Sequence, residues 1–149
     1  MIVVEINGGL GNQMFQYAFG MALAHLNNTK LELDISEFNV EETNFVKRNF
    51  ELDIFDFPKS FCNMYGLNKF KPTTNLIKRV VRKINPHKIY KEPHFSFDKN
   101  ALKLKGNYFF QGYWQSERYF SQIANNVRTA FDFKVLKNEQ TNLISNQIL

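Results

Sequence analysis

The first forty residues show the pattern strand, loop, helix, strand. Residues 2–6 are a short apolar run rich in β-branched residues that ends at a turn signal, which predicts a strand. Residues 14–26 are apolar almost all round, as in a helix that is buried on several sides. Residues 30–36 alternate between apolar and polar positions and predict a second strand. Because the connections are short and include a helix, we expect the two strands to be parallel.

The second half of the chain carries three more segments with a readable pattern. Residues 74–84 predict a helix that has an apolar face and a basic face, and Pro86 ends it. Residues 108–113 predict a strand, and Ser116 is placed to cap a helix that runs to about Phe131. Between residues 37 and 73 the pattern is irregular, with a short helix after Pro58, while residues 137–149 suggest a last helix.

These elements predict an α/β fold, a Rossmann-like parallel sheet flanked by helices. The length of 149 residues fits one domain, and 44% of them are hydrophobic, so residues 1–149 can bury a core. A single cysteine, Cys62, excludes an internal disulfide and favours a reducing compartment. The N-terminus lacks the pattern of a signal peptide, and no apolar run is long enough to span a membrane. We therefore expect a protein that is cytoplasmic or peripherally bound to a membrane.

Basic residues are concentrated in one region. Residues 57–91 contain no acidic residue and nine of the 19 basic ones, whereas the other ten basic residues are outnumbered by 14 acidic ones. Four of the nine form the basic face of the helix over 74–84: Lys78, Arg79, Arg82 and Lys83. This face is either an ordinary solvated surface or a contact with anionic lipid. Nucleic acid is not expected as a partner, because aromatic residues do not alternate with these charges.

A glycine-rich turn connects the first strand to the first helix. Gly8, Gly9 and Gly11 allow a sharp bend and a close approach of ligand to backbone. The backbone N–H groups that open the helix suit phosphates and sugar hydroxyls, and the amides of Asn12 and Gln13 add donors and acceptors. We expect Asn12 to cap the helix as well.

This turn has three other interpretations. A dinucleotide site would need a third glycine where Met14 stands, although Asp34 lies where such folds place their ribose-binding acid. A phosphate-binding loop of the GxxxxGK[ST] type is absent from the sequence. A tight turn without any ligand also fits the glycines alone.

Two segments, GGLGNQMFQYAFG and FQGYWQSERYF, resemble signature segments of the family 11 glycosyltransferases, the α-1,2-fucosyltransferases. The stretches LELDIS, FELDIF and EPHFSFD occur in the same order as in that family. The resemblance covers essentially the whole chain but only the first part of the family's length. It implies the N-terminal portion of a two-domain, GT-B-like enzyme that transfers L-fucose from GDP-fucose to the 2-hydroxyl of a terminal galactose, with inversion and without a cofactor or an obligatory metal.

The sequence departs from that family at one motif. The family's donor site includes a later His-x-Arg-Arg-x-Asp motif, and this chain contains no adjacent arginine pair. We therefore expect a fragment, a split gene or a truncated product that has little or no transferase activity alone. A non-catalytic module that binds carbohydrate or nucleotide is the alternative function, and a Rossmann-type oxidoreductase domain is disfavoured by Met14.

The resemblance and the residue chemistry together suggest a set of site residues. The substrate-binding candidates are Gly8, Gly9, Gly11, Asn12, Gln13, Gln111, Tyr113, Trp114 and Gln115, and the catalytic candidates are Glu117 and His94. Trp114 would stack on a galactose face. Some of these candidates also have a structural interpretation. Residues 109–115 would be a buried strand with a helix cap, Glu117 an acid in the first turn of a helix, and His94 a solvated loop histidine. Asp34, Cys62 and His25 are expected to be structural.

Overall fold

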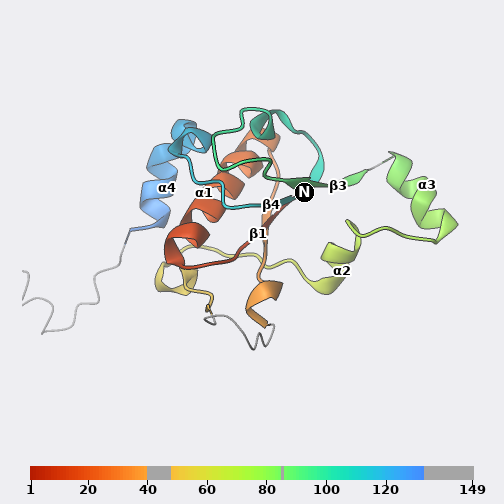
Figure 1. Cartoon of the computed structure of the whole chain (residues 1–149), viewed down its shortest axis with the longest axis horizontal. Coiled ribbons are helices and arrows are strands. Elements are labelled where there is room, and N and C mark those ends of the chain that lie inside the picture. Colours follow the sequence, from red (N-terminus) through yellow and green to blue (C-terminus); the bar gives the residue numbers. More distant parts are fainter. Residues whose placement is uncertain (40–47, 85, 133–149) are drawn as a thin grey trace, which may run out of the picture.

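A computed structural model describes residues 1–39, 48–84 and 86–132, which are built around a four-stranded sheet (Figure 1). The strands are β1 (Ile2–Glu5), β2 (Leu31–Asp34), β3 (His87–Lys91) and β4 (Asn107–Gln111). They pair in the order β2-β1-β4-β3, and every neighbouring pair is parallel. The predicted α/β fold with a parallel sheet and flanking helices is confirmed.

In the described part of the chain, four α-helices accompany the sheet: α1 (Leu10–Asn27), α2 (Met64–Asn68), α3 (Leu76–Ile84) and α4 (Ala124–Ala130). Short 3₁₀ turns lie at residues 36–39, 52–54, 101–103, 117–119 and 121–123. Figure 1 shows α1 running across the sheet, with α4 outside it and α3 standing apart beyond β3. None of the described helices has the length and apolarity needed to cross a membrane.

Strand β1 is buried on both faces because side chains alternate along it. Ile2 and Val4 join the main core under α1, whereas Val3 points to the other face and packs in a smaller cluster with Leu67 and Phe70 beside α2. A continuous apolar run is typical of a parallel strand that is covered on both sides. The sequence IVVE therefore forms the centre of the sheet.

Helix α1 approaches the sheet closely because it has a glycine at the contact. A Cβ atom on Gly20 would lie 2.7 Å from Leu31 Cδ1 and 3.0 Å from Val4 Cγ2, so a larger residue would push the helix outward. On its outer side, Ala18 and Ala22 pack against Ile123 and Val127 of the α4 region. The described residues thus form layers in the order α4, α1, sheet and α2.

Strand β3 was not predicted from the sequence. Its residues, HKIYK, are partly or mostly exposed at the edge of the sheet, where Lys88, Ile89 and Lys91 reach solvent. Charged residues are common on edge strands, because they oppose pairing with other chains. Such a strand carries no apolar run, so its pairing with β4 was not apparent from the local pattern.

Two predicted helix starts were wrong. Helix α1 begins at Leu10 rather than residue 14, with Gly9 as its N-cap and no side-chain capping bond, so Asn12 lies inside the first turn and is not the cap. The predicted helix from Ser116 is two 3₁₀ turns followed by α4, and Ser116 makes no capping bond. The backbone leaves helical geometry at Phe120 and Ile123, which allows both Tyr119 and Ile123 to be buried.

The remaining helix predictions had mixed outcomes. The helix over 74–84 is confirmed as α3, and the short helix after Pro58 as α2, where Asn63 accepts a capping bond of 2.8 Å from the Gly66 N–H. The suggested helix over 137–149 lies outside the described residues.

Candidate functional site

The candidate site lies where β1 and β4 end, side by side. Helix α1 takes the chain from β1 to β2 on one side, while β4 pairs with the other side of β1. In open α/β sheets, ligands bind at the carboxyl ends of the strands at such a point of divergence. Two segments meet there, residues 6–9 after β1 and residues 112–116 after β4.

The glycine turn after β1 presents backbone donors that no described residue accepts from within the helix. Gly8 has φ of 71°, in the region that favours glycine. The first helical hydrogen bond runs from the Gln13 N–H to the Gly9 carbonyl at 3.1 Å, so the three preceding N–H groups have no intrahelical acceptor. No acidic residue occupies the first turn of α1. Since Gly8 and Gly9 are half-buried and Gly11 is exposed, the turn is open to solvent at its tip.

A cation stands next to this turn. A Cβ atom on Gly9 would lie 3.9 Å from Nη1 of Arg48, which is an exposed residue. The guanidinium is therefore close to the positive end of the α1 dipole, an arrangement that an anion bound between them would stabilise. Arginine suits phosphate because its planar donors match phosphate oxygens.

Gln16 ties the two loops together from below. This residue is fully buried on α1. Its Oε1 accepts the Asn7 N–H at 3.0 Å, and its Nε2 donates to Asn7 Oδ1 at 2.8 Å and to the Gly112 carbonyl at 3.0 Å. One amide thus fixes the loop after β1 against the loop after β4, and it sets the width of the site.

A second bridge joins the same loops at the surface. Nε2 of Gln115 donates to Oδ1 of Asn12 at 2.6 Å. Gln115 is exposed and Asn12 is half-buried, so both amides keep hydrogen-bonding capacity toward a ligand. The structure therefore brings Gln115 next to the turn that contains Gly8, Gly9, Gly11 and Asn12, while their role as a binding site stays a prediction.

Glu92, which follows β3, holds the loop after β4 in its shape. Its carboxylate accepts the Tyr113 N–H at 2.7 Å and the Trp114 N–H at 3.1 Å. The loop has two positive φ values, 152° at Gly112 and 55° at Trp114. A left-handed conformation is unfavourable for a bulky aromatic residue, and the two backbone N–H groups that donate to the Glu92 carboxylate stabilise it.

Gln111 and Glu5 form a polar pair at the strand ends. Nε2 of Gln111 donates to Oε1 of Glu5 at 2.9 Å, and the Asn7 side chain reaches the other carboxylate oxygen at 3.4 Å. Burial raises the pKa of Glu5, and the bond from Gln111 opposes that rise. Gln111 is thus partly used by the protein itself, and its exposed fraction is intermediate.

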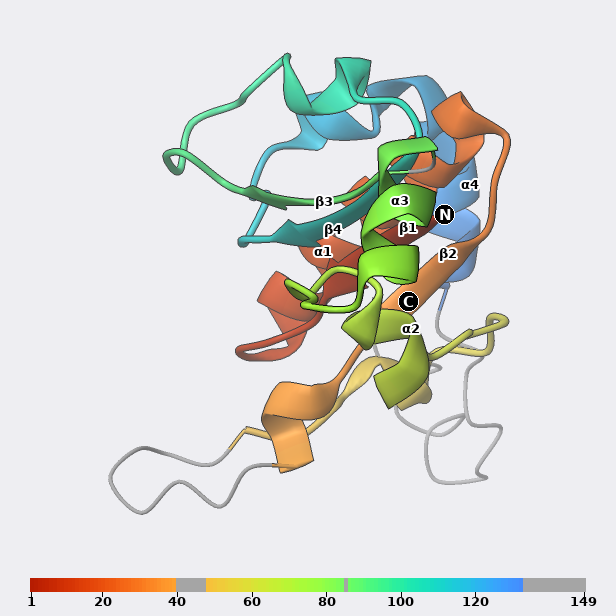
Figure 2. The same cartoon turned by 90° about the vertical axis from the view of Figure 1, so that its right-hand side faces the viewer.

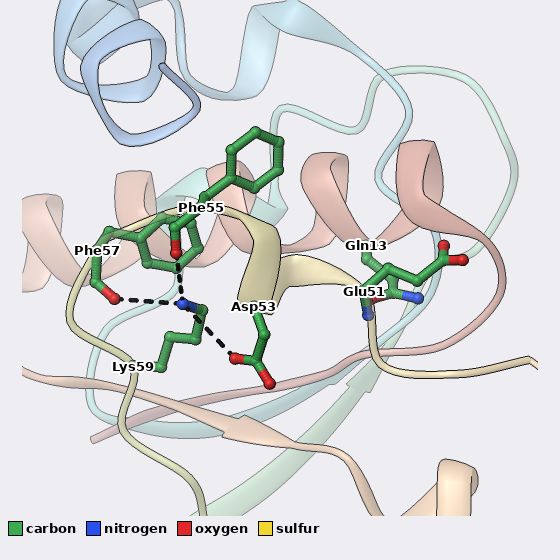
Figure 3. A network of polar contacts seen from close by, with 6 residues as sticks. All are labelled: Gln13, Glu51, Asp53, Phe55, Phe57 and Lys59. Atoms are coloured by element: carbon green, nitrogen blue, oxygen red, sulfur yellow. Dashed lines mark hydrogen bonds and ion pairs between the residues drawn. The ribbon is translucent and has the colours of Figure 1, made fainter. Parts of the chain in front are cut away.

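Two of the predicted binding residues are structural. Trp114 is fully buried and stacks on Phe19, with ring centroids 4.1 Å apart and planes 7° apart, so its faces are not accessible to a galactose ring. Its indole N–H finds no acceptor among the described residues. Gln13 is also fully buried: Nε2 donates to the Gly8 and Asn49 carbonyls at 2.9 and 2.8 Å, and Oε1 accepts the Glu51 N–H at 2.9 Å (Figure 3 shows Gln13 beside Glu51).

The two catalytic candidates lie on neighbouring segments. His94 is exposed in the loop after β3, and its imidazole is within 2.8 Å of the Ser96 hydroxyl. That loop reaches the site through Phe95, whose ring centroid is 6.2 Å from that of Tyr113, a half-buried residue. Glu117 is exposed in the 3₁₀ turn 117–119, as a first-turn acid. No hydrogen bond within the described residues joins either of them to the glycine turn.

The residues expected to be structural have ordinary positions. Asp34 is buried at the end of β2, and its Oδ1 accepts the Ser36 N–H at 3.0 Å. Cys62 is partly buried, and burial raises the pKa of its thiol to about 12. His25 is exposed in the last turn of α1. In the part of the chain that the structure describes, no group of three or more metal-ligating side chains is assembled.

Four residues of the site were missed by the sequence analysis: Glu5, Gln16, Arg48 and Glu92. Gln16 lies within the segment GGLGNQMFQYAFG and Glu92 within the stretch EPHFSFD, so both were inside quoted motifs. Nothing local distinguished these two, because both bind backbone atoms that are distant along the chain: Gln16 binds Gly112, 96 positions away, and Glu92 binds Tyr113, 21 positions away.

The fold and this edge define an α/β domain with an open glycine turn at the carboxyl ends of its central strands. No family model matches the sequence, and no solved structure matches it. Among curated proteins, the chain is similar to an α-1,2-colitosyltransferase from Escherichia coli, with 30% identity over 135 residues. The aligned region is 88% of this chain but 44% of that protein, so the chain spans less than half the length of the relative. The relative is a glycosyltransferase, in agreement with the class indicated by the motifs.

Proposed function

We propose that the chain is the N-terminal part of a glycosyltransferase of the α-1,2-fucosyltransferase type. The observation that carries the proposal is the pair of loops held together by Gln16, since it leaves the free N–H groups of α1 and the amides of Asn12 and Gln115 on one open edge. Such an edge suits the phosphates and hydroxyls of a nucleotide sugar or an acceptor sugar. The similarity to a colitosyltransferase supports the same class.

The proposed reaction moves L-fucose from GDP-fucose to the 2-hydroxyl of a terminal galactose. A base removes the proton of that hydroxyl, the oxygen attacks the anomeric carbon of fucose, and GDP departs with the bonding electrons. His94 and Glu117 are the proposed bases, both exposed on segments next to the loop after β4. Arg48 and the α1 N-terminus would stabilise the charge of the diphosphate. The proposal includes no cofactor and no obligatory metal.

Colitose is the alternative to fucose as the donor sugar. The relative's name assigns it colitose, which is L-fucose without its 3-hydroxyl group. A site that hydrogen-bonds this hydroxyl discriminates strongly against the deoxy sugar, whereas a site that leaves it in water accepts both. Calorimetric titration of the chain with GDP-fucose, GDP-colitose and GDP separates these cases. Tighter binding of GDP-fucose than of GDP-colitose supports fucose as the donor sugar. Tighter binding of GDP-colitose would assign colitose as the donor sugar instead.

A binding module without catalysis is the second candidate, since the sequence contains no adjacent arginine pair. A product assay with GDP-fucose and a terminal β-galactoside tests transfer directly. We expect the 149-residue chain to form little or no product alone, because the departing diphosphate lacks the arginines that the resembled family uses. Robust transfer by this chain would contradict that expectation, and binding of a sugar without GDP-fucose binding would favour the module.

The proposed location is cytoplasmic, with peripheral contact to an anionic membrane through the basic residues of α3. These are Lys78, Arg79, Arg82 and Lys83, within the acid-free residues 57–91. A glycolipid-linked acceptor would be presented at such a surface.

A further inference from the structure

Helix α3 exposes its apolar face as well as its basic residues. Five side chains at helical spacing are 57–83% exposed: Leu76, Ile77, Val80, Val81 and Ile84. Eleven large apolar side chains are strongly exposed in the described residues, and these five make up nearly half of them on one nine-residue helix. Scattered exposed apolar residues are normal, but a contiguous group of them marks a contact surface.

No described element covers this face. Helix α3 packs extensively against none of the other described helices and strands. Figure 1 shows that it stands apart from the rest of the fold beyond β3, away from α1 and α4, and in Figure 2, where that side faces the viewer, α3 lies in front. The candidate site lies instead at the carboxyl ends of β1 and β4, so contact at α3 does not require the glycine turn.

The charges around the helix indicate which partner covers it. Arg79 and Lys83 are exposed on α3, and residues 57–91, which include α2, α3 and β3, contain no acidic residue. A short helix with an apolar face and exposed cations, free of acids, is the pattern of an interfacial membrane helix. Anionic lipid satisfies both parts, because acyl chains take the apolar face while the headgroups pair with the cations.

We propose that α3 inserts its apolar face into the interface of an anionic membrane and anchors the domain there. This deepens the membrane contact proposed above, which involved the basic residues alone. If the contact were only electrostatic, added positive charge would strengthen it. If the apolar face inserts, a charge on that face weakens binding whatever its sign, because the charge must be desolvated or the helix must lift.

Sedimentation with phosphatidylcholine vesicles, with and without phosphatidylserine, tests this with the 149-residue chain. The double variant Ile77→Lys/Ile84→Lys is expected to bind anionic vesicles at least about tenfold more weakly than wild type, despite its two added charges. The matched control Ile54→Lys/Phe95→Lys adds the same charges at exposed apolar residues outside α3, and it is expected to bind at least as well as wild type.

A second variant tests the charges. Arg79→Gln/Lys83→Gln is expected to lose about fivefold in affinity for each removed charge, and binding of wild type should weaken as salt is added. Unchanged Trp114 fluorescence and urea midpoints establish that each variant is folded, since the substituted side chains are exposed.

Three results overturn the inference. They are wild-type protein that does not bind anionic vesicles, an Ile77→Lys/Ile84→Lys variant that binds as tightly as its control, and a wild-type dimer that this variant converts to monomer. The last result would assign the face to a second copy of the chain. Vesicle binding needs neither donor nor acceptor sugar, so its failure leaves the transferase proposal intact, and failure of nucleotide binding leaves this one intact.

Discussion

Replacing Gln16 by methionine removes the connection between the two loops of the site while keeping the side chain's length. Three hydrogen bonds are lost, two with Asn7 and one with the Gly112 carbonyl. At about 1 kcal/mol net for each bond, the loss is about 3 kcal/mol. Asn7 and Gly112 are only half-buried, so their freed groups regain some water and the range extends down to about 2 kcal/mol, whereas strain in the loops extends it to about 4.

Urea unfolding measures this change with two probes. The chain's only tryptophan, Trp114, lies in the loop after β4 and is fully buried, so its fluorescence reports on that loop, while far-UV circular dichroism reports on the helices. For a chain of this size, the expected loss lowers Tm by about 5–15 °C. Gln122→Met, at an exposed position, is the matched control and should change stability by less than about 0.5 kcal/mol. A Gln16→Met variant as stable as this control would refute the role of Gln16.

Two further predictions concern other loops of the fold. Gly112→Ala should lower the free energy of unfolding by about 2–4 kcal/mol, because the new methyl group would overlap Glu92 as well as strain the backbone. Gly106→Ala is also at positive φ but has open space around it, so it should lower the free energy of unfolding by only about 1 kcal/mol. Equal losses in urea titrations would argue against the overlap. Asp98 is buried, and although burial raises its pKa, hydrogen bonds from Tyr90 at 2.6 Å and from the Asn100 N–H at 2.8 Å lower it below 3.8 overall. Because the folded pKa is the lower one, this stabilisation is present above about pH 4 and is lost as the pH falls through the folded pKa, so Asp98→Asn should flatten the acid limb of the stability curve, and an unchanged limb would contradict the assignment.

The β1-α1-β2 unit could be predicted from the sequence because its signals are local. A buried parallel strand, a glycine turn and an apolar helix each show in a few neighbouring residues. Strand β3 could not be predicted, since an exposed edge strand such as HKIYK is defined by its pairing with β4 and not by its own pattern.

The position of the glycine turn could be predicted from the sequence, but not which of its neighbouring side chains are exposed. Glycines at a strand-to-helix turn indicate a binding edge, and the structure brings Asn12 and Gln115 to it. Whether an amide binds a ligand or supports the loops depends on its burial, and its burial depends on residues that are distant along the chain. The Gln13 amide is hydrogen-bonded to the backbone of Asn49 and Glu51, and the Trp114 ring stacks on Phe19. Each of the two motifs therefore contains both exposed residues and residues that support the loops.

The most direct test of the central claim is a titration of ¹⁵N-labelled chain with GDP-fucose, followed through backbone amide shifts. The account predicts the largest shifts at Gly8, Gly9 and Gly11 and in residues 112–115, with a loss of affinity in Arg48→Gln. A cavity of 230 Å³ lined by His25, Arg118 and Tyr119 lies elsewhere on α1. Shifts confined to that cavity, or none at the glycine turn with saturating nucleotide, would contradict the account.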